Sequence, residues 1–491
     1  MIAPSRPLVV ASNRGPVSFE PDETGEMVAR RGGGGLVTAL TGALSMTGGL
    51  WIACAMTEGD REQATSSEDG RIEVLAEDTK YDLRYLTPPP DVFDRYYNVI
   101  SNRILWFLHH FLWDTVRSPR FGSATREAWS DYRRVNEDFA TELASAGEAR
   151  HPAPVYLVQD YHLSLVPAML RERNPDALIG HFSHTPFAGP GYIQILPPDV
   201  ADALLRGLLG ADVLGFQSKR WAELFLMSCR MLPGATVDLR RRRVRLEGRE
   251  TLVRVYPISV DTAGLREVSR APGARGRRQR LRAGLPADGK LILRVDRTEL
   301  SKNILRGFLA YETLLRTHEE WRGRSRMLAL LNPSRRGIPE YRAYTRECLA
   351  AVERINEELG TEDWKPIDVR IQDDHDEVIA SYATYDVLMV NPVFDGMNLV
   401  AMEGPVLNRR DGVVLLSRNA GAIELLEDHV VPIAPFDVAD MAEALHRALT
   451  MPEDDRARWA RGIRRVVRSR PLSKWVGRQL SDLERLAEGR R

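Results

Sequence analysis

The stretch that decides the fold is Tyr385–Glu403, YDVLMVNPVFDGMNLVAME. Its first part contains an uninterrupted apolar run, Val387–Val390, which indicates a strand buried on both faces. A turn with Gly396 follows, and the apolar segment after it is typical of a helix. A buried strand, a turn and a helix are the repeating unit of an α/β protein.

The same kind of apolar run recurs along the chain, separated by amphipathic segments with helical periodicity. The runs are PLVVAS (7–12), PVYLVQD (154–160), ALIGHFSH (177–184), DVLGFQ (212–217), LILRVD (291–296), RMLALLNP (326–333) and GVVLLSR (412–418). Parallel strands covered by helices on both faces have this pattern. The sequence therefore predicts an α/β protein with doubly wound parallel sheets.

The length of 491 residues favours two domains over one core. A charged strand pair ends near 252–264, and a fresh apolar run begins at Leu291 after a basic segment. We predict a Rossmann-like N-terminal domain at 1–258 and a second Rossmann-like domain at 259–470. Pro471 should interrupt the C-terminal helical pattern, so that 471–491 forms a separate helix that crosses back to the first domain.

The composition limits the partners of this chain. Lys and Arg together number 68, as do Asp and Glu, so overall charge favours neither nucleic acid nor a membrane surface. The three cysteines are too scattered for a disulfide framework or a metal site. No apolar run approaches a membrane span, and the N-terminus lacks a signal-peptide pattern. We expect a cytoplasmic protein with no bound metal or cofactor; a homo-oligomer remains an open alternative.

The strongest basic element is RVDRTELSKN, in which Arg297 and Lys302 flank Glu299 directly after an apolar run. An arginine fork and a lysine this close together can converge on one pyrophosphate, with each charge-assisted bond contributing about 1.5–3 kcal/mol. The alternative is a surface ion pair with Glu299, which contributes about 0–1 kcal/mol. We favour the ligand interpretation.

Carboxylates and a histidine follow other apolar runs. Asp160 and His184 come where two consecutive runs end, a place where binding residues concentrate. Asp395 lies on the turn and Glu403 inside the apolar segment that follows. Asp395 could cap a helix, but we expect Glu403 two turns into a buried helix, where a carboxylate needs a partner such as a sugar hydroxyl. The glycine run that ends at Gly35 could bring the backbone close to an anion or form a flexible loop.

These motifs together resemble the trehalose-6-phosphate synthases, which are retaining glycosyltransferases of the GT-B fold with two Rossmann-like domains facing a central cleft. The resemblance covers nearly the whole chain. It rests on SNRGPV (12–17), GGL (34–36), GGLW (48–51), YYN (96–98), SNRILW (101–106), QDYHL (159–163), HTPF (184–187), LGFQ (214–217), YPI (256–258), DRTELSKN (296–303), FLAYE (308–312), DGMNLVAME (395–403) and AGAIELL (420–426).

The resemblance implies roles for individual residues. Those that would bind the nucleotide-sugar donor are Gly35, His184, Arg297, Lys302, Asp395, Gly396, Met397, Asn398, Leu399 and Glu403. Those that would bind the acceptor, glucose 6-phosphate, are Arg14, Tyr97, Trp106, Asp160 and Arg336. Asp160, His184, Arg297 and Lys302 would be catalytic, and the leaving phosphate would accept the proton of the acceptor hydroxyl, without a metal.

Several positions depart from the pattern of the family, namely Cys54, Glu299, Leu300, Asn303, Phe394, Met402 and Asn419. These departures lean toward a related branch of pseudo-glycosyltransferases, which couple a GDP-linked cyclitol to an aminocyclitol phosphate. Tyr97, Trp106 and the DGMN motif favour the sugar enzyme, and we predict that it transfers glucose from GDP-glucose in preference to UDP-glucose. A third alternative is a catalytically silent sugar-phosphate sensor, against which the retained donor residues argue.

Overall fold

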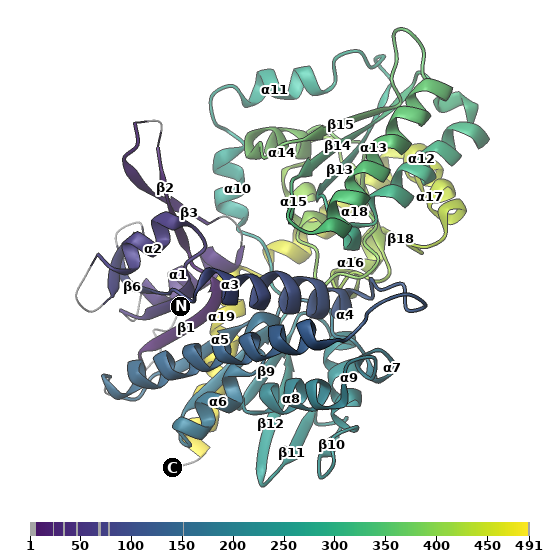
Figure 1. Ribbon diagram of the computed structural model, residues 1–491. Coiled ribbons are helices and arrows are strands. Elements are labelled where there is room, and N and C mark those ends of the chain that lie inside the picture. Colours follow the sequence, from purple (N-terminus) through teal and green to yellow (C-terminus); the bar gives the residue numbers. More distant parts are fainter. Residues whose placement is uncertain are drawn as a thin grey trace. The chain divides into compact units, whose positions relative to one another are not determined.

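A computed structural model describes residues 6–22, 24–32, 35–45, 48–66, 70–76, 79–150 and 152–489. The chain divides into two compact units. Unit 1 comprises Met1–Ile258 and Leu472–Arg491, and unit 2 comprises Ser259–Pro471. Each unit has its own sheet with helices against it (Figure 1).

Unit 1 is built on a ten-stranded sheet. Its strands, in spatial order, are β10 (Thr236–Asp238), β11 (Arg243–Leu246), β12 (Arg249–Val255), β9 (Val213–Phe216), β8 (Leu178–Ser183), β7 (Val155–Gln159), β1 (Leu8–Arg14), β4 (Leu50–Cys54), β6 (Thr79–Leu86) and β5 (Arg71–Ala76). The strands from β12 to β6 are parallel, and antiparallel strands close both edges. The strand order reverses between β1 and β7.

Helices cover both faces of this sheet. Contacts join α1 (Gly35–Ser45) to α19 (Leu472–Gly489), and α5 (Ser123–Glu148) to α6 (Val166–Arg173) and through it to α8 (Pro198–Leu209). The remaining elements of unit 1 are the hairpin β2 (Val17–Pro21) and β3 (Met27–Arg31), and α2 (Glu58–Ala64), α3 (Pro90–Asp94), the π-helical segment η1 (Arg95–Leu105), α4 (Trp106–His110), η2 (Tyr161–Leu163), α7 (Pro190–Ile193) and α9 (Lys219–Cys229).

Unit 2 is built on a six-stranded parallel sheet. Its strands, in spatial order, are β15 (Ile367–Ile371), β14 (Ser325–Asn332), β13 (Lys290–Arg297), β16 (Val387–Val390), β17 (Val413–Ser417) and β18 (Val431–Ile433). Numbered within the unit, the order is 3-2-1-4-5-6, as in dinucleotide-binding folds, and it reverses between β13 and β16. The apolar runs predicted as parallel strands are confirmed in both sheets.

Two groups of helices cover the unit 2 sheet (Figure 1). The helices are α10 (Thr262–Val268), α11 (Ala274–Leu281), η3 (Leu300–Lys302), α12 (Ile304–Thr317), η4 (Glu319–Trp321), α13 (Pro339–Leu359), α14 (His375–Tyr382), α15 (Val400–Leu407), α16 (Ile423–Leu426), η5 (Glu427–His429), α17 (Val438–Thr450) and α18 (Glu453–Arg468). Contacts join α12 to α13 and α17, and α14 to α11 and α15. Apolar residues of the sheet and of α12, α13 and α17 form a continuous core.

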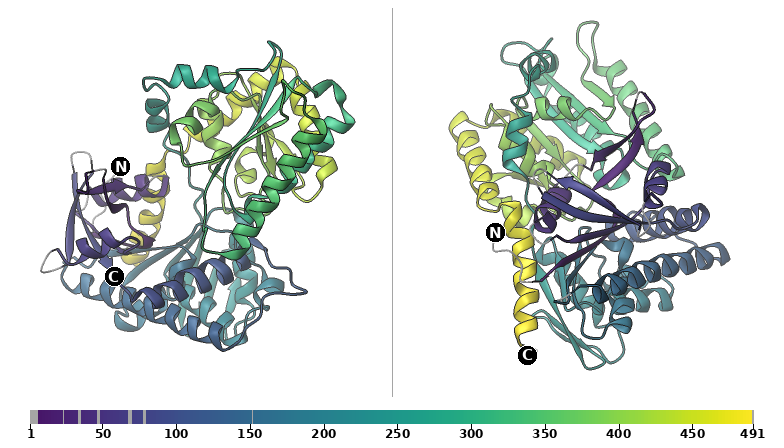
Figure 2. Two further views of the ribbon diagram at one scale, coloured as in Figure 1. Left: turned by 45° about the horizontal axis from the view of Figure 1, so that its top comes forward. Right: turned by 90° about the vertical axis from the view of Figure 1, so that its left-hand side faces the viewer.

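The last helix, α19, belongs to unit 1 although it follows unit 2 in sequence. It begins directly after Pro471 and contacts α1, β8 and β9 (Figure 2). The indole N–H of Trp475 donates to the carbonyl of Tyr256 at 3.0 Å, and the Tyr256 hydroxyl donates to Asp482 at 2.5 Å. Within the described residues, every helix is too short or too polar to cross a membrane.

Candidate functional site

In unit 2, the predicted donor residues lie where the strand order reverses. Arg297 ends β13, Lys302 ends the short η3 turn after it, and Asp395 follows β16, the neighbouring strand. In open parallel sheets, ligands bind outside the carboxyl ends of the strands at this reversal. The fold therefore brings together residues that are almost 100 positions apart in the sequence.

Lys302 and Asp395 form an ion pair across this reversal. The ammonium lies 2.5 Å from Asp395 Oδ2, and each side chain is 14% exposed. Burial alone would lower the pKa of Lys302, but the nearby carboxylates of Asp395 and Glu299 outweigh it, and the pKa is raised. Lys302 is therefore a cation throughout the neutral range. The side-chain amide of Asn398 also donates to Asp395 Oδ2, at 3.1 Å.

Asp395 does not cap the helix that follows it. Helix α15 begins at Val400, and no side chain caps it. Glu403 consequently lies in the first turn of α15 rather than two turns inside it, which corrects the sequence prediction. Asn398, with φ of 74°, carries the chain through a left-handed conformation before the helix. The segment 395–399 is thus a loop before the helix. The backbone N–H of Gly421 donates to the carbonyl of Asp395, and that of Ala422 donates to the carbonyl of Met397, which holds the loop in place.

Glu403 is largely buried, and one hydrogen bond to its carboxylate is identified in the described part of the chain. The Tyr382 hydroxyl donates to Oε2 at 3.2 Å. Burial raises the pKa of Glu403, and the tyrosine hydrogen bond acts in the opposite direction. A carboxylate has acceptor capacity for several bonds, so this group can take hydroxyls from a ligand.

Arg297 belongs to a second charged set, centred on Glu299. Glu299 is fully buried, with Arg297 Nη2 at 2.9 Å from Oε1 and Arg335 Nη1 at 2.9 Å from Oε2. Arg335 also donates to the Tyr341 hydroxyl at 2.7 Å. The side chain of Arg297 is 48% exposed, so Glu299 fixes one edge of its guanidinium while the other edge faces solvent. The sequence alternative of an exposed ion pair is therefore wrong for Glu299, because this acid lies in the interior.

Arg335 and Arg336 both follow β14, and the sequence predicted a binding role for Arg336 alone. Arg336, which was predicted to bind the acceptor phosphate, is exposed. Arg335 has a φ of 41°, and this backbone conformation accompanies its contact with Glu299. Two adjacent arginines carry no periodic signal that distinguishes the inward from the outward one, so sequence alone could not choose between them.

In unit 1, the strand order reverses between β1 and β7, and both strands end in predicted acceptor residues. Arg14 ends β1 and Asp160 follows β7. The Arg14 guanidinium donates to the Tyr97 hydroxyl at 3.3 Å, which joins two predicted residues directly. Tyr97 lies in the π-helical segment η1, a geometry often found at functional sites, and it stacks on His162. Trp106, also predicted, is buried and stacks on His110.

Asp160 and His184 are linked at the ends of β7 and β8. Asp160 has a φ of 70°, and its Oδ1 accepts the backbone N–H of His184 at 3.0 Å. This strained, sparsely populated conformation is typical of residues that are held in place for a function.

The His184 ring is held between two glutamines. Gln217 Oε1 accepts the Ile258 N–H at 2.9 Å, so its amide nitrogen faces His184 Nδ1, at 3.3 Å, as a donor. The other ring nitrogen, Nε2, then donates to Gln159 Oε1 at 3.1 Å. Burial, and to a smaller extent the neighbouring His181, lowers the pKa of His184 to about 3. His184 is therefore a neutral, fixed group rather than a free proton carrier.

The glycine run is only partly visible. Gly35 begins α1, whereas Gly33 and Gly34 lie outside the described residues.

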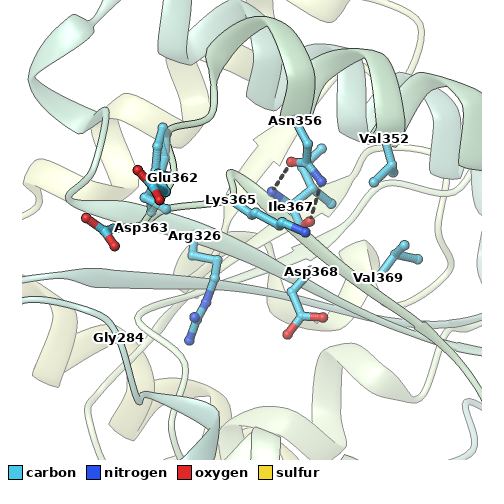
Figure 3. A pocket seen from close by; sticks show the side chains of 11 residues that line it. Gly284, Arg326, Val352, Asn356, Glu362, Asp363, Lys365, Ile367, Asp368 and Val369 are labelled. Carbon is cyan, nitrogen blue, oxygen red and sulfur yellow. Dashed lines mark hydrogen bonds between the residues drawn. The ribbon is translucent and has the colours of Figure 1, made fainter.

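A surface pocket of about 490 Å³ in unit 2 is lined by Arg326, Asn356, Lys365 and Asp368, among others (Figure 3). It lies where β14 and β15 begin, not where they end, and it contains none of the predicted site residues.

Rossmann-like sheets with basic and hydroxyl-accepting residues after their strands occur in many nucleotide-binding proteins, and sequence similarity identifies this one as a glycosyltransferase. The model of glycosyltransferase family 20 matches residues 6–485 of the chain. This chain belongs to that family.

Three similar proteins illustrate the range of the family. Validamine 7-phosphate valienyltransferase of Streptomyces hygroscopicus subsp. jinggangensis is 34% identical over 97% of this chain and 94% of the relative. Trehalose-6-phosphate synthase of Mycolicibacterium paratuberculosis is 35% identical over 98% of this chain and 95% of its own. A UDP-forming α,α-trehalose-phosphate synthase of Burkholderia xenovorans, solved in complex with glucose 6-phosphate, has a TM-score of 0.82 at 28% identity, covering 97% of this chain and 100% of that one.

The structure explains one departure from the family pattern. Asn303, where the family commonly has glycine, adopts φ of 57°, the left-handed region that glycine favours. Its side-chain amide donates to the carbonyls of Asn391 at 3.0 Å and Pro435 at 2.6 Å. Asparagine tolerates this backbone better than other side chains and bonds locally. The substitution therefore has a structural cause and needs no change of donor to explain it.

Proposed function

We propose that this enzyme transfers glucose from a nucleoside diphosphate glucose to glucose 6-phosphate with retention of configuration, which yields α,α-trehalose 6-phosphate. The observation that carries this proposal is the pair of strand-order reversals, each of which has predicted residues at its strand ends. In unit 2 the predicted donor residues Arg297, Lys302 and Asp395 lie after β13 and β16, and in unit 1 the predicted acceptor residues Arg14 and Asp160 lie at the ends of β1 and β7. The similar proteins that synthesise trehalose 6-phosphate support the same reaction.

In this proposal the cations of unit 2 bind the donor pyrophosphate. Arg297 offers a guanidinium edge that faces solvent, and Lys302 offers an ammonium held by Asp395. As the glycosidic bond breaks, negative charge grows on the leaving diphosphate, and fixed cations stabilise it more than they stabilise the ground state. Glu403 binds the ribose hydroxyls, and the 395–399 loop contributes further donor contacts.

The acceptor residues follow the same logic. Arg14 and Tyr97, already in contact, bind the phosphate of glucose 6-phosphate, and Asp160 accepts its sugar hydroxyls. Trp106 adds an aromatic contact to the acceptor. Arg336, which is exposed and follows β14, is the last member of the proposed acceptor set. His184, as a neutral ring fixed by Gln159 and Gln217, positions the donor sugar.

A second candidate is the coupling of a GDP-linked cyclitol to an aminocyclitol phosphate. The observation that favours it is the 34% identity to the valienyltransferase over nearly the whole chain. The donor nucleotide also remains a proposal: we favour GDP-glucose over UDP-glucose, whereas the Burkholderia xenovorans protein is UDP-forming.

Product identification separates these candidates. The enzyme is incubated with GDP-glucose or UDP-glucose plus glucose 6-phosphate, and in parallel with a GDP-linked cyclitol plus validamine 7-phosphate. Proton NMR of a non-reducing disaccharide phosphate with two α-anomeric signals supports the synthase. Product from the cyclitol pair alone overturns the synthase in favour of coupling, and no product from either pair favours the sensor.

Variants of the donor cations test the mechanism. Arg297→Ala and Lys302→Ala should each lower turnover by at least about 100-fold, since each removes on the order of 3 kcal/mol of charge stabilisation. Arg297 is half exposed, whereas Lys302 is largely buried in its ion pair with Asp395, so circular dichroism and thermal unfolding must show that each variant keeps its fold. Near-normal turnover in both variants would contradict the assignment.

A further inference from the structure

Four side chains meet beside the helices of unit 2, away from the proposed donor site. His318 directly follows α12, and Glu320 lies in η4, just before β14 begins. Glu443 and His446 lie three residues apart on α17, which contacts α12. One ligand atom from each of His318, Glu320 and His446 lies within 4.8 Å of the other two.

The protonation of His318 follows from its neighbours. Its Nε2 lies 3.1 Å from Glu443 Oε1. A carboxylate only accepts, so Nε2 carries a proton, and Nδ1 is the ring nitrogen that an ion could bind. Nδ1 faces Glu320 Oε1 at 3.6 Å.

His446 presents a second lone pair in the same place. The indole N–H of Trp321 donates to His446 Nδ1 at 3.2 Å, so this nitrogen is an acceptor. It lies 3.8 Å from the same oxygen of Glu320. The two imidazole rings are stacked, with centroids 3.8 Å apart and planes at 9°. Two ring nitrogens and a carboxylate oxygen thus share one small space, as the ligands of a cation do.

We propose that His318, Glu320 and His446 bind a Zn²⁺ ion. Two imidazoles and a carboxylate are a common zinc ligand set, with a water as the fourth ligand. Zinc bonds of about 2.0–2.1 Å place tetrahedral ligands about 3.3–3.4 Å apart, so the contacts of 3.6 and 3.8 Å need to shorten by a few tenths of an ångström. The two stacked rings must also tilt apart when the ion binds, because each imidazole lone pair lies in the plane of its ring.

Neighbouring residues complete the proposed site. Glu443 accepts a hydrogen bond from Nε2 of His318, the ring nitrogen that does not face the ion. A carboxylate in this position is the usual partner of a metal-bound histidine. Trp321 gives up its hydrogen bond to His446 when the ion enters. The imidazole side chains are 22% and 26% exposed, which leaves the ion a path from solvent. The ion ties the end of α12 to α17 and is structural, not catalytic.

Zinc binding by the full-length chain tests this proposal. After treatment with a chelator, the protein is titrated with Zn²⁺ in competition with a chromophoric chelator. We expect one tight site, weakened at least about 100-fold in His318→Asn and in His446→Asn. Glu443→Gln should weaken it about 10–100-fold, because it alters only the outer partner. The control His375→Asn, at an exposed residue at the start of α14, should bind as the wild type does.

A second variant makes the test independent of folding defects. Trp321→Phe removes the group that competes for His446 Nδ1, so it should bind Zn²⁺ more tightly than the wild type. Thermal unfolding of each variant with and without Zn²⁺ gives a second readout, because an ion that binds only the folded state raises Tm. Wild-type binding no tighter than that of the His318→Asn, His446→Asn double variant would overturn the proposal, as would wild-type affinity in Glu443→Gln.

Discussion

Glu299 shows how one buried acid positions a reactive cation. It contacts both Arg297 and Arg335 from a fully buried position, so the two guanidiniums are held apart from each other and fixed in direction. A lysine or arginine held in this way loses little freedom when a phosphate binds, which favours affinity and rate.

We predict that Glu299→Gln impairs both activity and stability. The neutral amide leaves two buried or half-buried arginines without a counter-charge, at a cost of about 3–5 kcal/mol in unfolding free energy. kcat/KM should fall about 10–100-fold, because Arg297 is no longer fixed. Steady-state kinetics and denaturant unfolding measure the two effects.

A matched control is Glu312→Gln. Glu312 lies on α12 of the same unit and pairs with Arg316 and Arg354, away from Arg297. This variant should lose stability without losing kcat/KM. An equal loss of kcat/KM in both variants would show that Glu299 acts only through stability.

At the residue scale, sequence reasoning found the charged groups but not their partners. Lys302 and Asp395 were both predicted to bind the donor, but their direct contact depends on the neighbouring positions of β13 and β16. The same holds for His318 and His446, which come from segments 128 residues apart, so that no spacing rule could have indicated a metal site.

At the scale of elements, α19 is an integral part of unit 1. Its buried face includes Trp475, Val476, Leu480 and Leu483, and Trp475 packs edge-on against Phe182 of β8. The helix also lies beside His184, whose ring centroid is 5.9 Å from that of Trp475. A C-terminal helix therefore supports the strand end that carries a predicted site residue.

We predict that Trp475→Ala lowers the unfolding free energy of unit 1 by about 3–5 kcal/mol, since it leaves a cavity and removes the bond to Tyr256. Chemical denaturation followed by circular dichroism measures this loss. Gly477→Ala on the same helix is the control: its new methyl group meets no atom within 4 Å, so stability should rise by about 0.5–1 kcal/mol. A loss below about 1 kcal/mol for Trp475→Ala would mean that α19 is only loosely attached.

Two buried histidines should make unit 1 sensitive to acid. Burial lowers the pKa of His109 in α4 to about 3 and that of His181 in β8 to about 4. Both values lie below the value of about 6.5 in an unfolded chain, so the unfolded state binds protons first. The neutral rings stabilise the folded state fully above pH 6.5. This stabilisation is lost as the pH falls from about 6.5 to the pKa values of the folded state.

Between pH 6.5 and 5, each of these histidines should cost about 1.5 kcal/mol of unfolding free energy, or about 3 kcal/mol together. His184, whose pKa burial also lowers to about 3, should add a similar amount. Denaturant unfolding at several pH values measures the slope. His109→Gln should flatten this slope relative to the wild type, whereas His375→Gln, at an exposed position, should leave it unchanged. A wild-type slope identical to that of His109→Gln would contradict the burial argument.

At the scale of the whole molecule, the apolar runs predicted the two parallel sheets well. Each run was buried on both faces, so its composition alone indicated its environment. The charged strand pair predicted at the end of the first sheet is the antiparallel pair β11 and β12. The other antiparallel strands of that sheet, β5 and β10, were not foreseen, because short half-exposed strands have a weaker apolar pattern. The strand order, and with it the reversal points that gather the site residues, depends on long-range pairing that a linear pattern does not encode.

The central claim is that the two sets of residues serve one transfer reaction. The most direct measurement is release of nucleoside diphosphate from GDP-glucose and from UDP-glucose, each with and without glucose 6-phosphate and without added metal, with Lys302→Ala as the inactive control. The account predicts release that depends on glucose 6-phosphate, faster with GDP-glucose, and absent in the variant. No release from either donor, or release at the same rate without glucose 6-phosphate, would contradict it.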